Sequence, residues 1–233
     1  MTQLQGIGQR ACQIRATISE ACAQSGRDPQ EVLLIGVSKT VDVDAVEQAI
    51  TAGIHDFGEN RPCELARKHD AFPEQRWHFI GNIQSRQLNQ VVGRAYLIHS
   101  LWDRDHASRI DRLAAAAGVI QDVLIEVNDG EDNKQGLDPR DLWPMLEHCA
   151  ILPHLRVRGL MIMAPAHDPQ RARQTFASLA CLRDETAHRL VALGADNIAL
   201  DELSMGMTDD YPLAILEGAT MVRVGRALFS EDS

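Results

Sequence analysis

Aromatic residues and basic charge are both scarce in this chain of 233 residues, which has 4% aromatic content and a formal net charge of −10. Nucleic-acid surfaces need Lys and Arg against the phosphates and aromatic rings that stack on bases. An acidic chain with few rings is therefore a poor candidate for binding nucleic acid or an anionic membrane surface. No stretch of the chain approaches the roughly 18 apolar residues of a membrane-spanning helix, so we expect no such helix.

Cysteine is also sparse, and its spacing argues against two kinds of site. The five cysteines are Cys12, Cys22, Cys63, Cys149 and Cys181. Their number is odd and none forms a CxxC pair, which argues against a disulfide framework and a zinc site. The histidines show no metal-ligand spacing either, so we expect no metal. Free thiols predict a reducing compartment and MTQLQGIGQR has no apolar signal-peptide stretch, so we expect a cytoplasmic protein.

Strand and helix patterns alternate along the chain after an opening amphipathic helix over residues 2–24. The expected strands are 32–38, 54–58, 77–81, 96–99, 122–128, 156–162, 198–203 and 221–225. The expected helices are 42–52, one from residue 62, 85–92, 103–117, 139–149, 169–193 and 209–217. Eight strands that alternate with helices predict an α/β fold, a (β/α)8 TIM barrel with an additional N-terminal helix, as one domain over 1–233.

An open doubly wound sheet is the competing architecture. It would usually place a glycine-rich phosphate loop after the first strand, whereas this chain reads SKTVDVD there. No linker or low-complexity segment divides the chain, and the clearest loop is 129–137, which is rich in turn formers. The barrel is therefore the favoured interpretation.

Unusual residues gather at the carboxyl ends of the expected strands, where the loops of a barrel converge on one mouth. They are Lys39, Glu59, Asn60, Gly81, Asn82, His99, Asn128, Met161, Met163, the segment 204–207 and the segment 223–226. Strand ends meet polar loops in any protein, which accounts well for the asparagines. It accounts less well for Lys39 and for the two glycine-bearing segments after strands seven and eight.

Lys39 and those two segments indicate a particular ligand. Apolar surroundings disfavour an ammonium group and leave a free amine that can attack a carbonyl. Loops after strands seven and eight often hold a phosphate, and Gly206 and Gly225 would let the backbone approach it closely. An amine that faces a phosphate site is what pyridoxal 5'-phosphate requires. Arg223 could meet the ring nitrogen and, because it only donates, would leave that nitrogen unprotonated.

A series of motifs follows the same order as the strands. They are GVSKT (36–40), FGEN (57–60), WHFIG (77–81), Gln84-Ser85, GLM (159–161), SMGM (204–207) followed by Thr208-Asp209-Asp210, and TMVRVG (220–225). These motifs resemble the pyridoxal phosphate homeostasis protein family, also called the YggS or PROSC family, which looks like the barrel half of alanine racemase. The resemblance runs from about Val32 to Phe229. It implies a barrel that holds pyridoxal phosphate on Lys39 as a Schiff base.

The resemblance, together with the positions at the strand ends, predicts a set of cofactor-binding residues. They are Lys39, Asn60, Met161, Ser204, Arg223, Gly225 and Arg226. Ser204 and the backbone near Gly225 would hold the phosphate. Arg226 departs from the family, which has a hydroxyl residue there, and would either contact the phosphate through its charge or face solvent. Lys134 matches a family lysine but is also an ordinary loop residue, and alternation along its strand could turn His78 away from the mouth.

Three functions fit these residues. The first is a binding protein for pyridoxal phosphate that acts in vitamin B6 homeostasis as a monomer and passes the cofactor to apo-enzymes. The second is an amino-acid racemase, which needs two bases on opposite faces of the substrate. The chain ends at Ser233, just after strand eight, and has only Tyr96 and Tyr211, so we expect neither a further β-domain nor robust turnover. The third, a Schiff-base aldolase, uses Lys39 but leaves the last two motifs unexplained.

Overall fold

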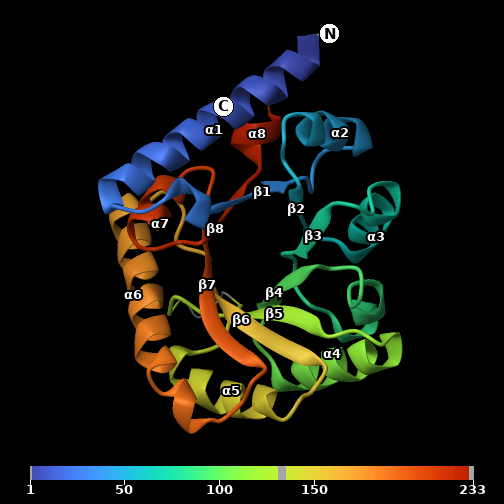
Figure 1. Ribbon diagram of the computed structural model, residues 1–233, viewed down its shortest axis with the longest axis vertical. Coiled ribbons are helices and arrows are strands. Elements are labelled where there is room, and N and C mark those ends of the chain that lie inside the picture. Colours follow the sequence, from blue (N-terminus) through green and yellow to red (C-terminus); the bar gives the residue numbers. More distant parts are fainter. Residues whose placement is uncertain (1, 131–134, 231–233) are drawn as a thin grey trace.

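Eight parallel strands close into a barrel in the computed structural model, which describes residues 2–130 and 135–230 (Figure 1). The strands are β1 (Leu33–Val37), β2 (Asp56–Glu59), β3 (Arg76–Phe79), β4 (Leu97–Leu101), β5 (Gln121–Glu126), β6 (Leu155–Met161), β7 (Ile198–Met207) and β8 (Met221–Val224). Each strand pairs with the next in sequence, and β8 closes the barrel against β1. The predicted (β/α)8 barrel is confirmed.

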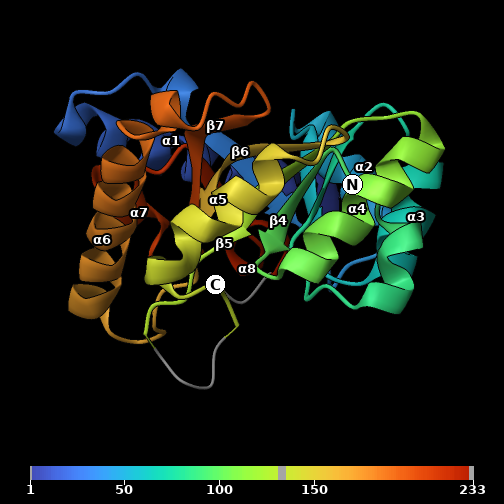
Figure 2. The same cartoon turned by 90° about the horizontal axis from the view of Figure 1, so that it is seen from below.

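Helices surround the barrel and cover the outer faces of the strands (Figures 1 and 2). The α-helices are α1 (Thr2–Ser25), α2 (Val43–Thr51), α3 (Pro62–Ala71), α4 (Arg104–Ala117), α5 (Leu142–Ala150), α6 (Pro169–Ala187), α7 (Tyr211–Leu216) and α8 (Arg226–Phe229). The 3₁₀-helices are η1 (Pro29–Glu31), η2 (Ser85–Gln90), η3 (Pro139–Asp141) and η4 (Leu190–Ala192). The expected N-terminal helix is α1, which packs against α2, α7 and α8. None of the helices in the described part of the chain combines the length and apolar character of a membrane span.

Aspartates start several of the helices immediately after the strands. Asp42 accepts a hydrogen bond from Val43 N at the start of α2, and Asp103 accepts one from His106 N at the start of α4. Asp168 does the same for Arg171 N at the start of α6. A side-chain oxygen at this position satisfies an amide that the first helical turn leaves unpaired. These caps fix where the chain turns from the barrel mouth into each outer helix.

The core has two parts, which lie on opposite faces of the strands. Outside the barrel, the strands and helices form one large apolar cluster that includes Phe57 and Trp77, whose rings stack with centroids 5.2 Å apart. Inside the barrel, a small apolar cluster contains Ile35, Leu97, Leu124, Met161 and Met221. The rest of the barrel interior carries buried polar side chains, and these form much of the candidate site.

Four expected elements differ from the structure. The expected helix over 85–92 is the 3₁₀-helix η2, whose N-cap residue Gln84 makes no side-chain capping hydrogen bond. The expected helix over 139–149 divides into η3 and α5, and the expected helix over 169–193 divides into α6 and η4. The SMGM segment, expected after strand seven, lies within β7, because irregular register against β6 and β8 lets that strand continue to Met207. Lys134 lies outside the described residues.

Candidate functional site

Lys39 lies in a turn directly after β1, at the carboxyl end of the barrel strands. In the alternation of β1, Leu33 and Ile35 face the inner apolar cluster, and the strand ends two residues before Lys39. The side chain of Lys39 is exposed, so the apolar surroundings expected from its place at a strand end are not found around it. Ser38, not Lys39, occupies the buried position where the strand ends.

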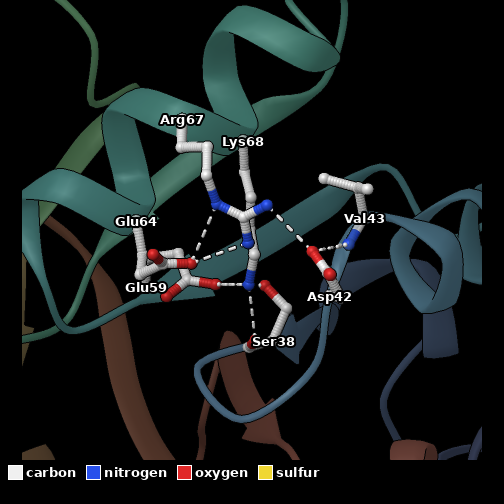
Figure 3. A network of polar contacts seen from close by, with 7 residues as sticks. All are labelled: Ser38, Asp42, Val43, Glu59, Glu64, Arg67 and Lys68. Atoms are coloured by element: carbon white, nitrogen blue, oxygen red, sulfur yellow. Dashed lines mark hydrogen bonds and ion pairs between the residues drawn. The ribbon is translucent and has the colours of Figure 1, made fainter.

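A buried ion pair holds the residue next to Lys39 (Figure 3). Lys68 Nζ, from α3, donates to Glu59 Oε1 at 2.5 Å and to the backbone oxygen of Ser38 at 2.7 Å. The Ser38 hydroxyl donates to the same Glu59 oxygen at 2.6 Å. All three residues are fully buried, so the contacts are shielded from water. Lys68 and Glu59 therefore fix the start of the turn that carries Lys39.

A second cation of α3 holds the other end of this turn (Figure 3). Arg67 Nη1 donates to Asp42 Oδ1 at 2.8 Å, and its Nη2 donates to Glu64 Oε2 at 2.8 Å. The hydrogen bond from Arg67 lowers the pKa of Asp42, which also caps α2. Consecutive side chains of α3 thus bind both ends of the segment 38–42.

Arg223 and Ser204 meet inside the barrel. Arg223 Nη1 donates to Ser204 Oγ at 2.5 Å, and its Nη2 donates to the backbone oxygen of Ile162 at 3.1 Å. Burial lowers the pKa of Arg223 to about 10, against the attraction of Glu126 and Asp210. Within the described part of the chain, the hydrogen-bond acceptors of this buried cation are therefore two neutral oxygens.

Two histidines extend this contact across the barrel. His99 Nδ1 lies 2.8 Å from Ser204 Oγ, and its Nε2 lies 2.9 Å from His78 Nδ1. His78 Nε2 lies 3.1 Å from Asp56 Oδ1, and Asp56 also pairs with Arg76. His78 therefore points into the barrel interior. Its direction could not be decided from the sequence alone. His99 lies within β4, and its partner Ser204 is 105 residues away in sequence.

Two carboxyl groups lie near Arg223, and one of them, Glu126, was not among the residues that the sequence indicated. Burial raises the pKa of Glu126 to about 7, against the effect of Arg223. Burial also raises the pKa of Asp210, whose Oδ1 accepts a hydrogen bond from Met207 N at 2.6 Å. Glu126 does carry a signal in the sequence, because a charged residue interrupts the apolar run VLIEV. Asp210 belongs to the motif that follows SMGM, but the sequence did not predict that it acts on Arg223.

The remaining expected residues lie in different surroundings. Asn60 is exposed and, together with Asn82 and Gln84, lines a cavity of about 440 Å³. Met161 is buried in the inner apolar cluster. Arg226 forms an ion pair with Asp209, and both side chains are largely exposed.

Two glycines permit close approaches of the backbone near these residues. A Cβ atom at Gly81 would lie 2.1 Å from the backbone oxygen of Asn60, so only glycine fits between the ends of β2 and β3. A Cβ atom at Gly225 would lie 3.3 Å from the backbone oxygen of Val37, at the end of β1. Gly225 therefore keeps β8 close to the strand that leads to Lys39.

Known relatives decide the family of the chain. The family described as "Alanine racemase, N-terminal domain" matches residues 13–232. A pyridoxal phosphate homeostasis protein of Aquifex aeolicus is 38% identical over 227 residues, which are 96% of this chain and 97% of the relative. One of Deinococcus radiodurans is 40% identical over 218 residues, 93% of this chain and 98% of the relative. The chain belongs to the pyridoxal phosphate homeostasis protein family.

A solved member of this family has the same fold. PipY of Synechococcus elongatus, whose structure contains bound pyridoxal phosphate, superposes with a TM-score of 0.79 at 34% sequence identity. The match covers 91% of this chain and 100% of PipY. The family that the sequence motifs indicated is thus confirmed. Among residues 2–130 and 135–230, no three His, Cys, Asp or Glu side chains gather in a way that could hold a metal ion.

Proposed function

We propose that this protein binds pyridoxal 5'-phosphate at the barrel mouth, holds it as a Schiff base on Lys39, and acts in vitamin B6 homeostasis as a carrier of the cofactor. One observation carries the proposal. Lys39 and Arg223 come from adjacent strands, because β1 pairs with β8 in a register that sets Ile35 opposite Arg223. The amine thus follows one strand, and the neighbouring strand carries a buried cation that has no carboxylate hydrogen-bond partner in the described part of the chain.

The residues at the mouth fit the chemical groups of this cofactor. Arg223 uses two N–H groups in hydrogen bonds to Ser204 and Ile162, and a guanidinium has five, so donors remain for a ring nitrogen or an anion. Glu59 Oε2 is a buried acceptor that has no partner among the described residues. Gly225, at the end of β8, has no side chain that would shield its backbone amide from a phosphate. Amine, donor and small backbone positions are the set that the cofactor requires.

Each residue has a distinct task in this proposal. When bound, the cofactor supplies an aldehyde that a lysine amine captures as a Schiff base. Lys39 supplies the amine, and α3 holds its turn through Lys68 and Arg67. Arg223 donates and retains its own proton, which favours an unprotonated ring nitrogen and a weak electron sink. That property suits a protein that stores a reactive aldehyde rather than one that removes an α-proton.

The test is the Lys39→Arg variant, which retains a positive charge and loses the free amine. We expect the unmodified protein to gain a visible absorbance band with pyridoxal phosphate. We also expect borohydride to trap the cofactor mass on Lys39 rather than on Lys68 or Lys134, the other two lysines of the chain. The variant should show neither the band nor the adduct. A full adduct in the variant, or one on another lysine of the unmodified protein, would refute the role of Lys39.

Recipient apo-enzymes, a monomeric state and a cytoplasmic location stay predictions. The described part of the chain has no disulfide among its five cysteines, three of which are exposed. Incubation of the loaded protein with a pyridoxal phosphate-dependent apo-enzyme tests carriage. The apo-enzyme should regain activity faster than the loaded protein releases the cofactor into buffer. Equal rates would reject direct transfer and leave storage of the cofactor as the role.

A further inference from the structure

Five buried side chains form an unbroken chain of hydrogen bonds through the barrel interior. Its members are Asp56 on β2, His78 on β3, His99 on β4, Ser204 on β7 and Arg223 on β8. The four links measure between 2.5 Å and 3.1 Å. All five side chains are nearly or fully inaccessible to solvent, so water does not compete with these links. The proposed function uses only the Arg223 end of this chain.

The chemistry of the two ends fixes the direction of every proton in between. A guanidinium can only donate, and an ionised carboxylate can only accept. Although burial opposes it, hydrogen bonds from His78 and Arg76 hold the pKa of Asp56 below its ordinary value. His78 therefore donates from Nε2 to Asp56, and its Nδ1 accepts from His99 Nε2–H. His99 Nδ1 then accepts from the Ser204 hydroxyl, whose oxygen accepts from Arg223.

When both imidazoles are neutral, each of the four hydrogen bonds contains one proton and every group has a partner of the right kind. A further proton on His99 Nδ1 would meet the Ser204 hydroxyl proton that already occupies that link, and one on His78 Nδ1 would meet the N–H of His99. Burial lowers the pKa of both rings. The charged groups that act on them are Asp56, Arg76 and Glu202 at His78, and Arg223 at His99.

We propose that His99 and His78 are positioning residues, which act as neutral Nε2–H tautomers to hold Arg223 in one orientation. Through Ser204 they fix the acceptor for one N–H of Arg223, and the backbone oxygen of Ile162 fixes a second. The other N–H groups of the planar guanidinium then point in a set direction. Because both acceptors are neutral, the charge of Arg223 stays available to a ligand acceptor. The expected effect on cofactor binding rests on the proposed function, whereas the arrangement of protons does not.

Long-range ¹H–¹⁵N NMR of the ligand-free protein tests the arrangement of protons directly. Both rings should give the signals of neutral Nε2–H tautomers, and neither should titrate near the ordinary histidine pKa of about 6.5. An Nδ1–H tautomer at His99, or titration of either ring near that value, would overturn the proposal. This measurement needs neither a variant nor bound cofactor.

Two substitutions of His99 test its effect on Arg223. His99→Leu removes both links, whereas His99→Gln keeps an acceptor for Ser204 and a donor for His78. The matched control is His148→Leu, which removes a 2.9 Å hydrogen bond to Ser108 on the outer helices. The dissociation constant for pyridoxal phosphate, measured by absorbance titration, should rise about two- to tenfold in His99→Leu. It should stay close to the unmodified value in His99→Gln and in the control.

The outcomes separate a positioning role from a structural one. Rescue by glutamine supports the proposal, because an apolar side chain of similar size would serve packing equally well. Equal affinity of His99→Leu and the unmodified protein would reject the positioning role even if NMR shows the expected tautomers. If the unmodified protein does not bind the cofactor at all, both the proposed function and the positioning role are rejected. The NMR measurement would then support only the assignment of the tautomers.

Discussion

At the scale of single residues, the sequence indicated the exposed Lys39 and missed the buried Lys68. Lys39 stands out because it follows an apolar run, whereas Lys68 stands in the polar helix PCELARKHDA and resembles a solvated residue. Its burial against Glu59 depends on where α3 packs, and sequence patterns do not give that. For the same reason, the partners of His99 could not be predicted from the sequence. A pattern predicts which face a residue lies on, but not which distant side chain it meets.

Removal of Lys68 should destabilise the protein strongly. Lys68→Met would leave Glu59 buried without its cation, and breaking one side of a buried ion pair costs about 3–5 kcal/mol. The free energy of unfolding from urea titration measures this loss. The double variant Lys68→Met/Glu59→Gln removes both charges and should recover a large part of it. A single variant within about 0.5 kcal/mol of the unmodified protein, the range of ordinary surface changes, would contradict a buried pair.

Glu126 should make stability depend on pH in a direction that is unusual for a carboxyl group. Its folded pKa of about 7 lies above the ordinary value of 4.5, so the folded state binds more protons than the unfolded state between these values. Its contribution to stability is therefore complete below pH 4.5 and is lost as the pH rises through 7. The depressed pKa values of His78 and His99 act oppositely, because their contribution is lost as the pH falls below about 6.5.

The Glu126→Gln variant isolates this contribution. Its stability relative to the unmodified protein should increase by about 1–3 kcal/mol between pH 5 and pH 8, since each unit of pKa shift is worth about 1.4 kcal/mol. Urea unfolding across that range, with Glu147→Gln as an exposed control, provides the measurement. A difference that stays constant with pH would show that the pKa of Glu126 is not raised.

At the scale of elements, the barrel could be predicted because strands and helices differ in period and length, but the ends of the elements could not. The SMGM segment resembles a loop because it contains Gly206, yet it completes β7. The register of β7 shifts against both neighbouring strands, and such irregularities depend on cross-strand contacts rather than on local sequence. The consequence for the site is that Ser204 points into the barrel and contacts Arg223 instead of lying in a mouth loop.

The junction of β7 and α7 should tolerate no side chain at Gly206. This residue has a φ of +91°, and a Cβ atom would lie 2.6 Å from Ala214 Cβ and 2.8 Å from Tyr211 Cα. Gly206→Ala therefore combines backbone strain with a steric clash and should destabilise by more than about 1 kcal/mol. Gly8→Ala in α1, where a Cβ atom meets nothing within 4 Å, is the control and should stabilise by up to about 1 kcal/mol. Thermal unfolding of both variants measures the contrast, and similar shifts would contradict a tight junction.

At the scale of the whole molecule, the positions of the possible bases in the barrel favour binding of a cofactor rather than catalytic turnover of a substrate. Racemisation needs a base on each face of the α-carbon, and general base catalysis contributes about 10²–10⁴-fold. Tyr96 precedes β4 and packs over Arg76, at the amino ends of the strands and away from the mouth. Tyr211 is buried at the start of α7, and Glu59 is held by Lys68 and Ser38.

We therefore expect no racemase turnover with alanine beyond a trace. Neither tyrosine of this chain offers an exposed phenol at the mouth opposite Lys39, and in the proposed site Arg223 would disfavour protonation of the ring nitrogen. Racemases of this type also have such an arginine, so the expectation depends on the lack of a tyrosine base opposite Lys39 among the described residues. Deuterium uptake at Cα in heavy water, followed by chiral chromatography, measures the reaction. Exchange with inversion at about 1 s⁻¹ or faster, the low end of ordinary enzymes, would reject cofactor carriage as the principal role and establish a racemase.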